Sequence, residues 1–280
     1  MTHATAVPTV ALHDGIEIPQ LGFGVFLVPP EDTREVVEEA LGAGYRHIDT
    51  AAAYGNERGV GEAIAASGLG REEVFVTTKL WNASQGFDST LAAFEKSLGR
   101  LGMEYVDLYL IHWPVPSRDL YLETWGAFEQ IHEEGRARTI GVSNFRIEDL
   151  ERLEKEAHRR PSVNQIELHP RLQQRELRAW QAEREIATEA WSPLAKGGEL
   201  LSDTTIGEIA ARYGKTPAQV ILRWHLQLGN VVIPKSVTPA RIRDNIEIFD
   251  FELSDGDMQA IERLDSGERT GPDPAVFVEP

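Results

Sequence analysis

The distribution of apolar and polar residues predicts two kinds of element that alternate along the chain. Short β-branched runs, typical of buried strands, are separated by stretches in which apolar residues recur every three or four positions, as on one face of a helix. Several of the runs are almost continuously apolar, which favours a parallel sheet covered by helices. The eight runs expected to be strands are residues 22–27, 47–50, 74–80, 106–112, 138–143, 163–167, 186–191 and 231–235.

The helices are predicted from their apolar spacing and from residues that start or stop a helix. Residues 31–33 (Glu-Asp-Thr) offer an N-cap for the first helix, and Gly42 and Gly44 predict where it ends. The same apolar spacing predicts further helices that contain residues 91–101, 125–131 and 150–157, and another is expected to begin near Asp203.

The order of these elements predicts an α/β fold, a (β/α)8 TIM barrel. Eight strands each followed by a helix, over about 250 residues, match that architecture. The rival is a doubly wound sheet, but both Gly-x-Gly sites, at 22–24 and 42–44, lack the third glycine of a dinucleotide fingerprint. Asp14-Gly15 between two alternating runs predicts an N-terminal β-hairpin. We expect one domain over residues 1–280, with a C-terminal tail from about residue 266.

Composition narrows the classes of function. The 280 residues include 28 Lys and Arg against 45 Asp and Glu, a formal charge of −17, which argues against nonspecific binding of nucleic acid or of an anionic membrane. The absence of cysteine excludes disulfides, a thiolate metal site and a cysteine nucleophile. The N-terminal residues do not resemble a signal peptide, and no apolar run approaches the roughly 18 residues of a membrane span. We therefore expect a cytoplasmic protein.

Four polar side chains are predicted to meet at one end of the barrel. Asp49, Lys79 and His112 lie at the ends of three predicted strands, and Tyr54 lies on the loop after the first of them. Active sites of such barrels lie at the carboxyl ends of the strands. Taken singly, these residues could form an ordinary ion pair with rim residues around it. Together they could donate a proton, because an ammonium stabilises tyrosinate, a carboxylate holds the ammonium, and an imidazole orients a carbonyl oxygen.

A proton donor reduces a carbonyl only if a cofactor supplies a hydride. Donors at the turn after the eighth strand, residues 235–238, suit a phosphate, and Arg241 suits the ribose phosphate that distinguishes NADPH. The alternative for this turn is an N-cap by Thr238 beside solvated basic residues, and Trp191 could be a core residue rather than a platform for the ring. The residues expected to bind the cofactor are Ser143, Asn144, Gln165, Trp191, Ser192, Leu194, Lys235, Ser236, Val237, Thr238, Arg241 and Asn245.

Three segments carry a resemblance to a known family. Residues 44–61 (GYRHIDTAAAYGNERGVG), 141–145 (GVSNF) and 233–245 (IPKSVTPARIRDN) resemble the signatures of the aldo-keto reductases. The similarity extends from the hairpin to about residue 265. Among the members, the chain most resembles the bacterial 2,5-diketo-D-gluconic acid reductases, through GFGVFLVPP, TTKLWN and NQIELHP.

The resemblance implies a monomeric, metal-free barrel that uses NADPH to reduce aldehydes and ketones, among them small dicarbonyls or keto-sugars. It implies that Tyr54 donates the proton, that Asp49 and Lys79 tune it, and that His112 orients the carbonyl. It also implies a substrate pocket walled by Phe26, Trp81 and Trp113, with Asn82 on its rim.

A regulatory function and a metal site are the alternatives to a reductase, and the C-terminal tail allows more than one conformation. The chain could be a regulatory barrel that binds a nucleotide with little turnover, although binding alone would not need a proton donor. His169 beside Glu167 suggests a metal ligand, but no second histidine lies at ligand spacing, so we expect no metal. Residues 267–280, rich in Pro, Gly and acidic residues, are expected to form an extended segment over the barrel or to be partly disordered. Phe277 could reach the pocket from this tail, but disorder at the surface is favoured.

Overall fold

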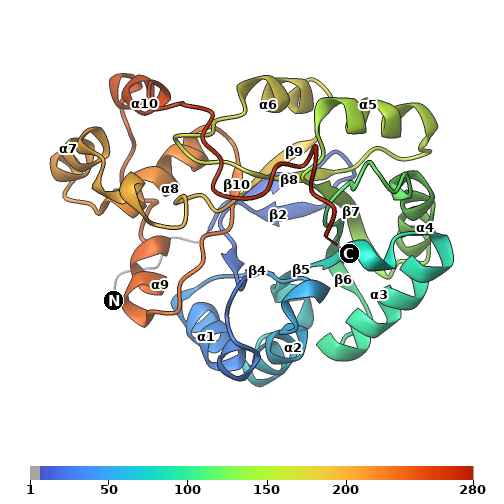
Figure 1. The fold of residues 1–280 in the computed structure, drawn as a ribbon. Coiled ribbons are helices and arrows are strands. Elements are labelled where there is room, and N and C mark those ends of the chain that lie inside the picture. The colour runs from blue at the N-terminus through green and yellow to red at the C-terminus, as the bar shows by residue number, and fades with distance from the viewer. Residues whose placement is uncertain (1–6, 280) are drawn as a thin grey trace.

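The computed structural model describes residues 7–279, whose strands form two sheets (Figure 1). The smaller is an antiparallel hairpin of β1 (Thr9–Ala11) and β2 (Glu17–Pro19). The larger contains eight parallel strands in sequential order. They are β3 (Phe23–Gly24), β4 (His47–Asp49), β5 (Phe75–Leu80), β6 (Val106–Ile111), β7 (Ala137–Ser143), β8 (Val163–Glu167), β9 (Ala187–Trp191) and β10 (Val231–Val232).

Backbone hydrogen bonds between the first and last strands close this sheet into a barrel. Leu21, just before β3, forms a parallel bridge with Val232 of β10. The Gly22 N–H donates to the Val232 carbonyl over 2.9 Å, and the Gly24 N–H donates to the Pro234 carbonyl over 3.1 Å. Closure leaves no exposed sheet edge. The predicted (β/α)8 barrel with an N-terminal hairpin is therefore confirmed.

The helices form a ring outside the strands (Figure 1). Short 3-10 turns lie at Ala52–Tyr54 (η1), Arg71–Glu73 (η2), Asn82–Ser84 (η3) and Glu199–Ser202 (η4). The α-helices are α1 (Pro30–Ala43), α2 (Glu57–Ala66), α3 (Phe87–Leu101), α4 (Tyr121–Glu133), α5 (Ile147–Glu156), α6 (Arg175–Ala182), α7 (Thr204–Tyr213), α8 (Pro217–Gln227), α9 (Pro239–Ile246) and α10 (Asp255–Glu262).

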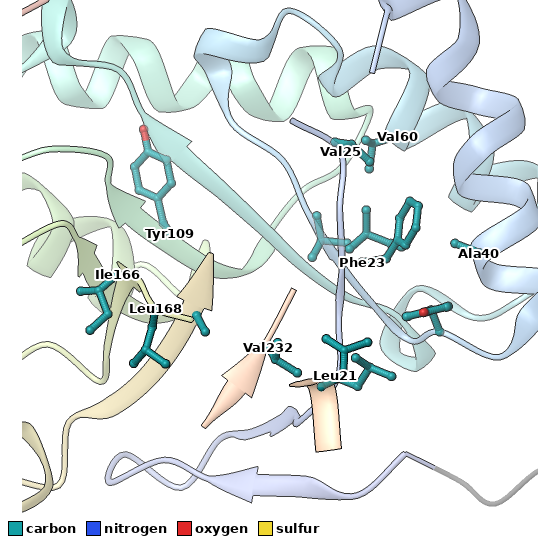
Figure 2. Close-up of a cluster of buried hydrophobic side chains, with 14 of the residues drawn as sticks. Leu21, Phe23, Val25, Ala40, Val60, Tyr109, Ile166, Leu168 and Val232 are labelled. Atoms are coloured by element: carbon teal, nitrogen blue, oxygen red, sulfur yellow. The ribbon is translucent and has the colours of Figure 1, made fainter. Parts of the chain in front are cut away.

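The main core lies between the barrel and this ring of helices. Figure 2 shows Leu21 and Val232 side by side where the barrel closes, and Phe23 nearby. Tyr109 of β6 stacks on Phe128 of α4 with ring centroids 4.4 Å apart. Because α4 presents its apolar residues to β6 at helical spacing, the pattern read from the sequence becomes the packing of the two elements.

The hairpin covers the amino end of the barrel. Leu12 and Ile18 form a second buried cluster with residues at or near the starts of strands, among them Phe75, Val163 and Val231. Asp14 accepts a hydrogen bond from the Ser162 hydroxyl over 2.8 Å. The Asp14-Gly15 hairpin prediction is confirmed, with a five-residue loop between the strands. The carboxyl end of the barrel is thus the end left for a site.

Several predicted boundaries are wrong. The first helix begins at Pro30, so residues 31–33 lie in its first turn and Thr33 donates to the Pro29 carbonyl. The first barrel strand stops at Gly24, not at residue 27, because the chain turns at Leu27 with φ of 58°. The last strand stops at Val232, before Pro234, which has no N–H to donate to a ladder. The helix predicted to reach residue 157 ends at Glu156.

β8 matches its prediction at both ends, and β4, β5, β6, β7 and β9 differ from theirs by one residue at one end. The helix expected near Asp203 is α7, and the Asp203 side chain caps it by accepting from the N–H groups of Thr205 and Ile206. Among the described residues, no helix has the length and apolarity needed to cross a membrane.

Candidate active site

Asp49, Lys79 and Tyr54 are brought together by neighbouring parallel strands. Asp49 ends β4, Lys79 lies near the end of β5, and Tyr54 ends the turn η1 that follows β4. The Lys79 ammonium lies 2.6 Å from Asp49 Oδ1, 2.9 Å from the Thr50 carbonyl and 3.5 Å from the Tyr54 hydroxyl. All its donors point to oxygen in a site where the lysine is fully buried. This removes the cost of an unpaired buried charge.

The protonation states in this group follow from burial and from these contacts. Burial lowers the pKa of Lys79, but Asp49 and Tyr54 outweigh it and raise that pKa above its ordinary value. Burial raises the pKa of Tyr54, and Lys79 opposes that rise without cancelling it. The predicted effect of Lys79 on the pKa of Tyr54 has the correct sign, but the opposing effect of burial is larger. The resting tyrosine therefore keeps its proton.

His112 follows β6 and lies over the same group. Its ring centroid is 5.7 Å from that of Tyr54 and 5.3 Å from that of Trp81. Burial, together with the Lys79 charge, holds the pKa of His112 well below its ordinary value, so its imidazole is neutral. The Asn144 side chain donates to the His112 carbonyl over 2.9 Å and fixes its backbone. A neutral imidazole has one N–H that can donate to an oxygen beside Tyr54.

Aromatic rings surround Tyr54 and His112. The Phe26 ring lies 5.0 Å from that of Tyr54 and is half-exposed, whereas Trp113 is buried. Trp81 contacts His112 from the far side. Asn82 is fully buried, and its amide donates to the Glu279 carbonyl over 2.8 Å. The C-terminal tail therefore covers Asn82.

The tail lies over the mouth of the barrel. In Figure 1 it runs from α10 across the barrel to the region of β6 and β7. The Phe277 ring is 4.3 Å from that of Trp113 and 6.5 Å from that of Trp81. Of the two expectations for the tail, an extended segment over the barrel is what the structure describes for residues 267–279. Phe277 reaches the pocket mouth and adds a wall to it, although the composition favoured surface disorder.

A buried carboxylate anchors this tail. Glu167, at the end of β8, accepts hydrogen bonds from the N–H and the hydroxyl of Thr270, each over 2.6 Å, and from the Gly271 N–H over 3.2 Å. Burial raises the pKa of Glu167, but its bonds from His169 and Thr270 outweigh burial and lower that pKa. Gly271 lies against Trp191, where an added Cβ would be 2.3 Å from the indole. The anchor therefore links the tail to the Trp191 side of the mouth.

The adjacent wall is formed by residues of β7, β8 and β9. They are Ser143 at the end of β7, Asn144 directly after it, Gln165 within β8, and Trp191 at the end of β9. The Ser143 hydroxyl donates to the Gln165 carbonyl over 2.9 Å, and the Trp191 indole N–H donates to Asn144 Oδ1 over 2.8 Å. Asn144 holds a left-handed backbone conformation with φ of 63°, which asparagine tolerates better than most residues. These bonds set the plane of the Trp191 ring at 65° to that of Trp113.

The remaining expected cofactor residues lie along two loops and α9. Ser192 and Leu194 are partly buried on the loop after β9, and Val237 is exposed on the loop before α9. The Ser236 hydroxyl accepts from the Thr238 N–H over 3.1 Å. Thr238 occupies the N-cap position of α9, but its side chain makes no capping bond among the described residues. Lys235 and Arg241, near the start of α9, are exposed to solvent, and Asn245, later in this helix, is buried.

Sequence reasoning missed Glu189 as part of the site. It lies in the middle of β9, is fully buried, and shares the Gln165 amide with Asp49. The signal was a charged residue inside an otherwise apolar strand, which is rare without a partner. The described residues contain no group of three or more histidine, aspartate and glutamate side chains that could hold a metal ion. His169 bonds Glu167 over 3.2 Å as part of the tail anchor.

Comparison with known proteins places the chain in a family. The model of the Aldo/keto reductase family matches residues 20–266. An aldo-keto reductase of Mycobacterium sp. (strain KMS) is 58% identical over 270 residues, 96% of this chain and 98% of that protein. Methylglyoxal reductase DkgA of Yersinia pestis is 53% identical over 274 residues, 98% of each chain. The chain belongs to the aldo/keto reductase family, as its motifs predicted.

A solved structure supports the same assignment. The crystal structure of a Gox0644 mutant in complex with NADPH matches with a TM-score of 0.94 and 49% identity, over 98% of this chain and 100% of that one. The two folds therefore agree over almost all of this chain.

Proposed function

We propose that this protein is an NADPH-dependent reductase of aldehydes and ketones, with small dicarbonyls such as methylglyoxal as its favoured substrates. The observation that carries the proposal is the buried Lys79 ammonium, held between Asp49 and the Tyr54 hydroxyl. A barrel that only bound a nucleotide would not need a proton donor beside a buried cation. The regulatory alternative therefore lacks a role for this group.

The residues present fit NADPH. Bound NADPH supplies the hydride. Lys235 and Arg241, both exposed at the start of α9, offer positive charge for the ribose phosphate of a protein that is otherwise strongly acidic. Ser143, Asn144 and Gln165 offer hydroxyl and amide groups for the carboxamide, and Trp191 offers a ring face. The other residues expected to contact this cofactor are Ser192, Leu194, Ser236, Val237, Thr238 and Asn245.

Tyr54 supplies the proton. Its phenol is protonated at rest because burial raises its pKa. As negative charge develops on a carbonyl oxygen beside it, the phenol donates its proton, and the tyrosinate that remains is stabilised by the Lys79 ammonium. The neutral His112 donates its N–H to the same oxygen and orients it. Asp49 acts as a positioning residue, since it holds Lys79 at 2.6 Å.

The aromatic walls favour small substrates. Phe26 lies beside Tyr54, and Trp81 and Trp113 lie beside His112. Phe277 from the tail packs on Trp113 at 4.3 Å. Large flat rings narrow the opening and have few polar groups for a bulky hydrophilic ligand. A relative with 53% identity is named a methylglyoxal reductase, which agrees with a small dicarbonyl.

We also propose that residues 1–280 form one domain that acts as a cytoplasmic monomer without nucleic-acid or membrane partners. One chain supplies every residue proposed for the site, so a partner subunit is not required. A chain without cysteine suits a reducing compartment.

The direct test is to offer purified protein NADPH with methylglyoxal, a simple aldehyde and a keto-sugar, and to follow loss of NADPH absorbance. We expect the highest kcat/KM with methylglyoxal and a much lower value with NADH in place of NADPH. A sample that binds NADPH but oxidises it with none of these compounds would contradict the proposed function.

A further inference from the structure

Glu189 is a buried carboxyl group for which the proposed reaction has no use. It lies in β9 with no exposed surface. One oxygen accepts from the Gln165 amide over 2.9 Å, and the other has no hydrogen-bond partner among the described residues. A buried carboxylate with one unpaired oxygen is costly, and a protonated carboxyl group in the same place costs much less because it carries no charge. The burial of Glu189 and its unpaired oxygen therefore favour the protonated form of this side chain.

Gln165 connects Glu189 to the proposed catalytic group. Its two amide hydrogens donate to Asp49 Oδ2 over 2.8 Å and to Glu189 Oε2 over 2.9 Å. An amide has only two N–H hydrogens, so the side-chain oxygen of Gln165 is what remains for another ligand. A cofactor carboxamide, which we assign to this wall, would have to donate to that oxygen. Glu189 is then joined through one side chain both to Asp49 and to the carboxamide.

The groups that face Glu189 come from four elements. Asp49 and His47 belong to β4, Lys79 to β5, Tyr54 to η1 and the uncharged Gln165 to β8. On the other side, β10 presents only valines, and Val231 pairs with Glu189. His47 Nε2 is 3.7 Å from Glu189 Oε1. One anion and one cation, Asp49 and Lys79, balance each other, so an ionised Glu189 would be an extra negative charge.

We propose that Glu189 is a positioning residue that acts through Gln165 and sets the relative affinity of the site for oxidised and reduced cofactor by gaining or losing a proton. The proposal rests on the proposed function. The oxidised nicotinamide ring is a cation and the reduced ring is neutral. An ionised Glu189 therefore favours the oxidised form, and a protonated Glu189 removes that preference.

The pH range of this effect follows from the same surroundings. Burial, and then the Asp49 charge, raise the pKa of Glu189 to about 8. Burial lowers the pKa of His47 to about 3, and the pKa of Tyr54 lies above its ordinary value, so neither titrates near neutrality. At neutral pH the free protein holds Glu189 protonated, and it ionises as the pH rises through about 8. A cofactor cation nearby would lower that raised pKa, so binding of NADP+ releases a proton.

The test is the ratio of the dissociation constants of NADP+ and NADPH, measured by quenching of tryptophan fluorescence between roughly pH 6 and roughly pH 9. Both forms carry the same phosphates and adenosine, so these contributions cancel in the ratio. We expect the affinity for NADP+ to rise relative to the affinity for NADPH as the pH rises. The total change should be about tenfold for each unit by which the ring cation lowers the pKa of Glu189. In Glu189→Gln the ratio should not change with pH, since the amide keeps the shape and cannot ionise.

Glu129→Gln is the matched control, because Glu129 is also buried but lies in α4 away from the site. It should keep the pH dependence of the wild type. If Glu189→Gln fails to fold, calorimetry of wild-type protein in two buffers decides the matter. Near neutral pH, NADP+ binding should release more protons than NADPH binding, because the phosphate that both forms share contributes equally to each. A ratio independent of pH in the wild type, with both forms bound, would overturn the inference. Failure to bind either form would instead contradict the proposed function.

Discussion

At the scale of single residues, the site depends on one ammonium group with three oxygen partners. Lys79 bonds Asp49 and the Thr50 carbonyl and reaches the Tyr54 hydroxyl. The first two contacts hold the charge in place, and the third directs it at the phenol. A cation fixed before the reaction stabilises the tyrosinate without reorganisation, which is how a preorganised site lowers a barrier.

Arg241 provides a prediction at this scale. Its guanidinium is exposed in the first turn of α9, where a ribose phosphate is proposed to bind. Arg241→Ala should weaken NADPH by about tenfold, or about 1.4 kcal/mol, and leave NADH nearly unchanged. Dissociation constants for both cofactors measure this, with Arg243→Ala in the same helix as a control. An equal effect on both cofactors would count against the phosphate role of Arg241.

Individual residues also show how far the sequence reaches. Asp49, Tyr54, Lys79 and His112 could be predicted to converge, because strand ends meet at one end of a barrel. The place of Phe277 could be given only as one option, since it depends on Glu167 holding Thr270 and Gly271, which lie 103 and 104 residues further along the chain. The rise in the pKa of Tyr54 could not be predicted from the sequence either, because it depends on which side chains bury the phenol.

At the scale of elements, close helix packing holds the ring outside the barrel. Gly61 of α2 meets the end of α3, and a Cβ added to it would lie 1.9 Å from the Leu101 carbonyl oxygen. No side chain fits there unless a backbone moves. Sequence periodicity predicted α3, but the need for glycine at its contact with α2 appears only when both helices are in place. The boundaries of β3 and β10 were mispredicted for a similar reason, because local turns rather than apolar residues end them.

This contact predicts contrasting effects for two glycines. Gly61→Ala should lower the free energy of unfolding by about 1–3 kcal/mol or more, because backbone at Leu101 must shift. Gly99→Ala in α3 should raise it by about 0.4–1 kcal/mol, because nothing lies within 4 Å of its added Cβ. Urea unfolding of both variants and the wild type measures the difference. Equal stability of the two variants would contradict the described packing of α2 and α3.

At the scale of the whole molecule, buried histidines link stability to pH. Burial lowers the pKa of His225 to about 3, and likewise that of His47, from an ordinary value of 6.5. A group with a lowered folded-state pKa resists protonation in the folded protein, so the unfolded state takes up protons first as the pH falls below about 6.5. Glu189 acts in the opposite sense, since its raised pKa of about 8 costs stability as the pH rises from 4.5 toward 8.

His225→Gln should therefore reduce the dependence of stability on pH. Between roughly pH 6.5 and roughly pH 5, where most carboxylates are still ionised, the slope of the free energy of unfolding should fall by up to about 1.4 kcal/mol per pH unit. The exposed His158→Gln is the matched control for loss of one imidazole. Urea titrations at several pH values give the slope of the free energy of unfolding against pH. Identical slopes for the wild type and His225→Gln would contradict a role for His225 in this pH dependence.

The measurement that tests the central claim most directly is the rate of methylglyoxal reduction by Tyr54→Phe with saturating NADPH. The ring and its packing on Phe26 remain, and only the donated proton is lost. We predict an unchanged dissociation constant for NADPH and a kcat lower by a factor of about 100 to 10,000. A variant that turns over at nearly the wild-type rate would contradict the assignment of Tyr54 as the proton donor.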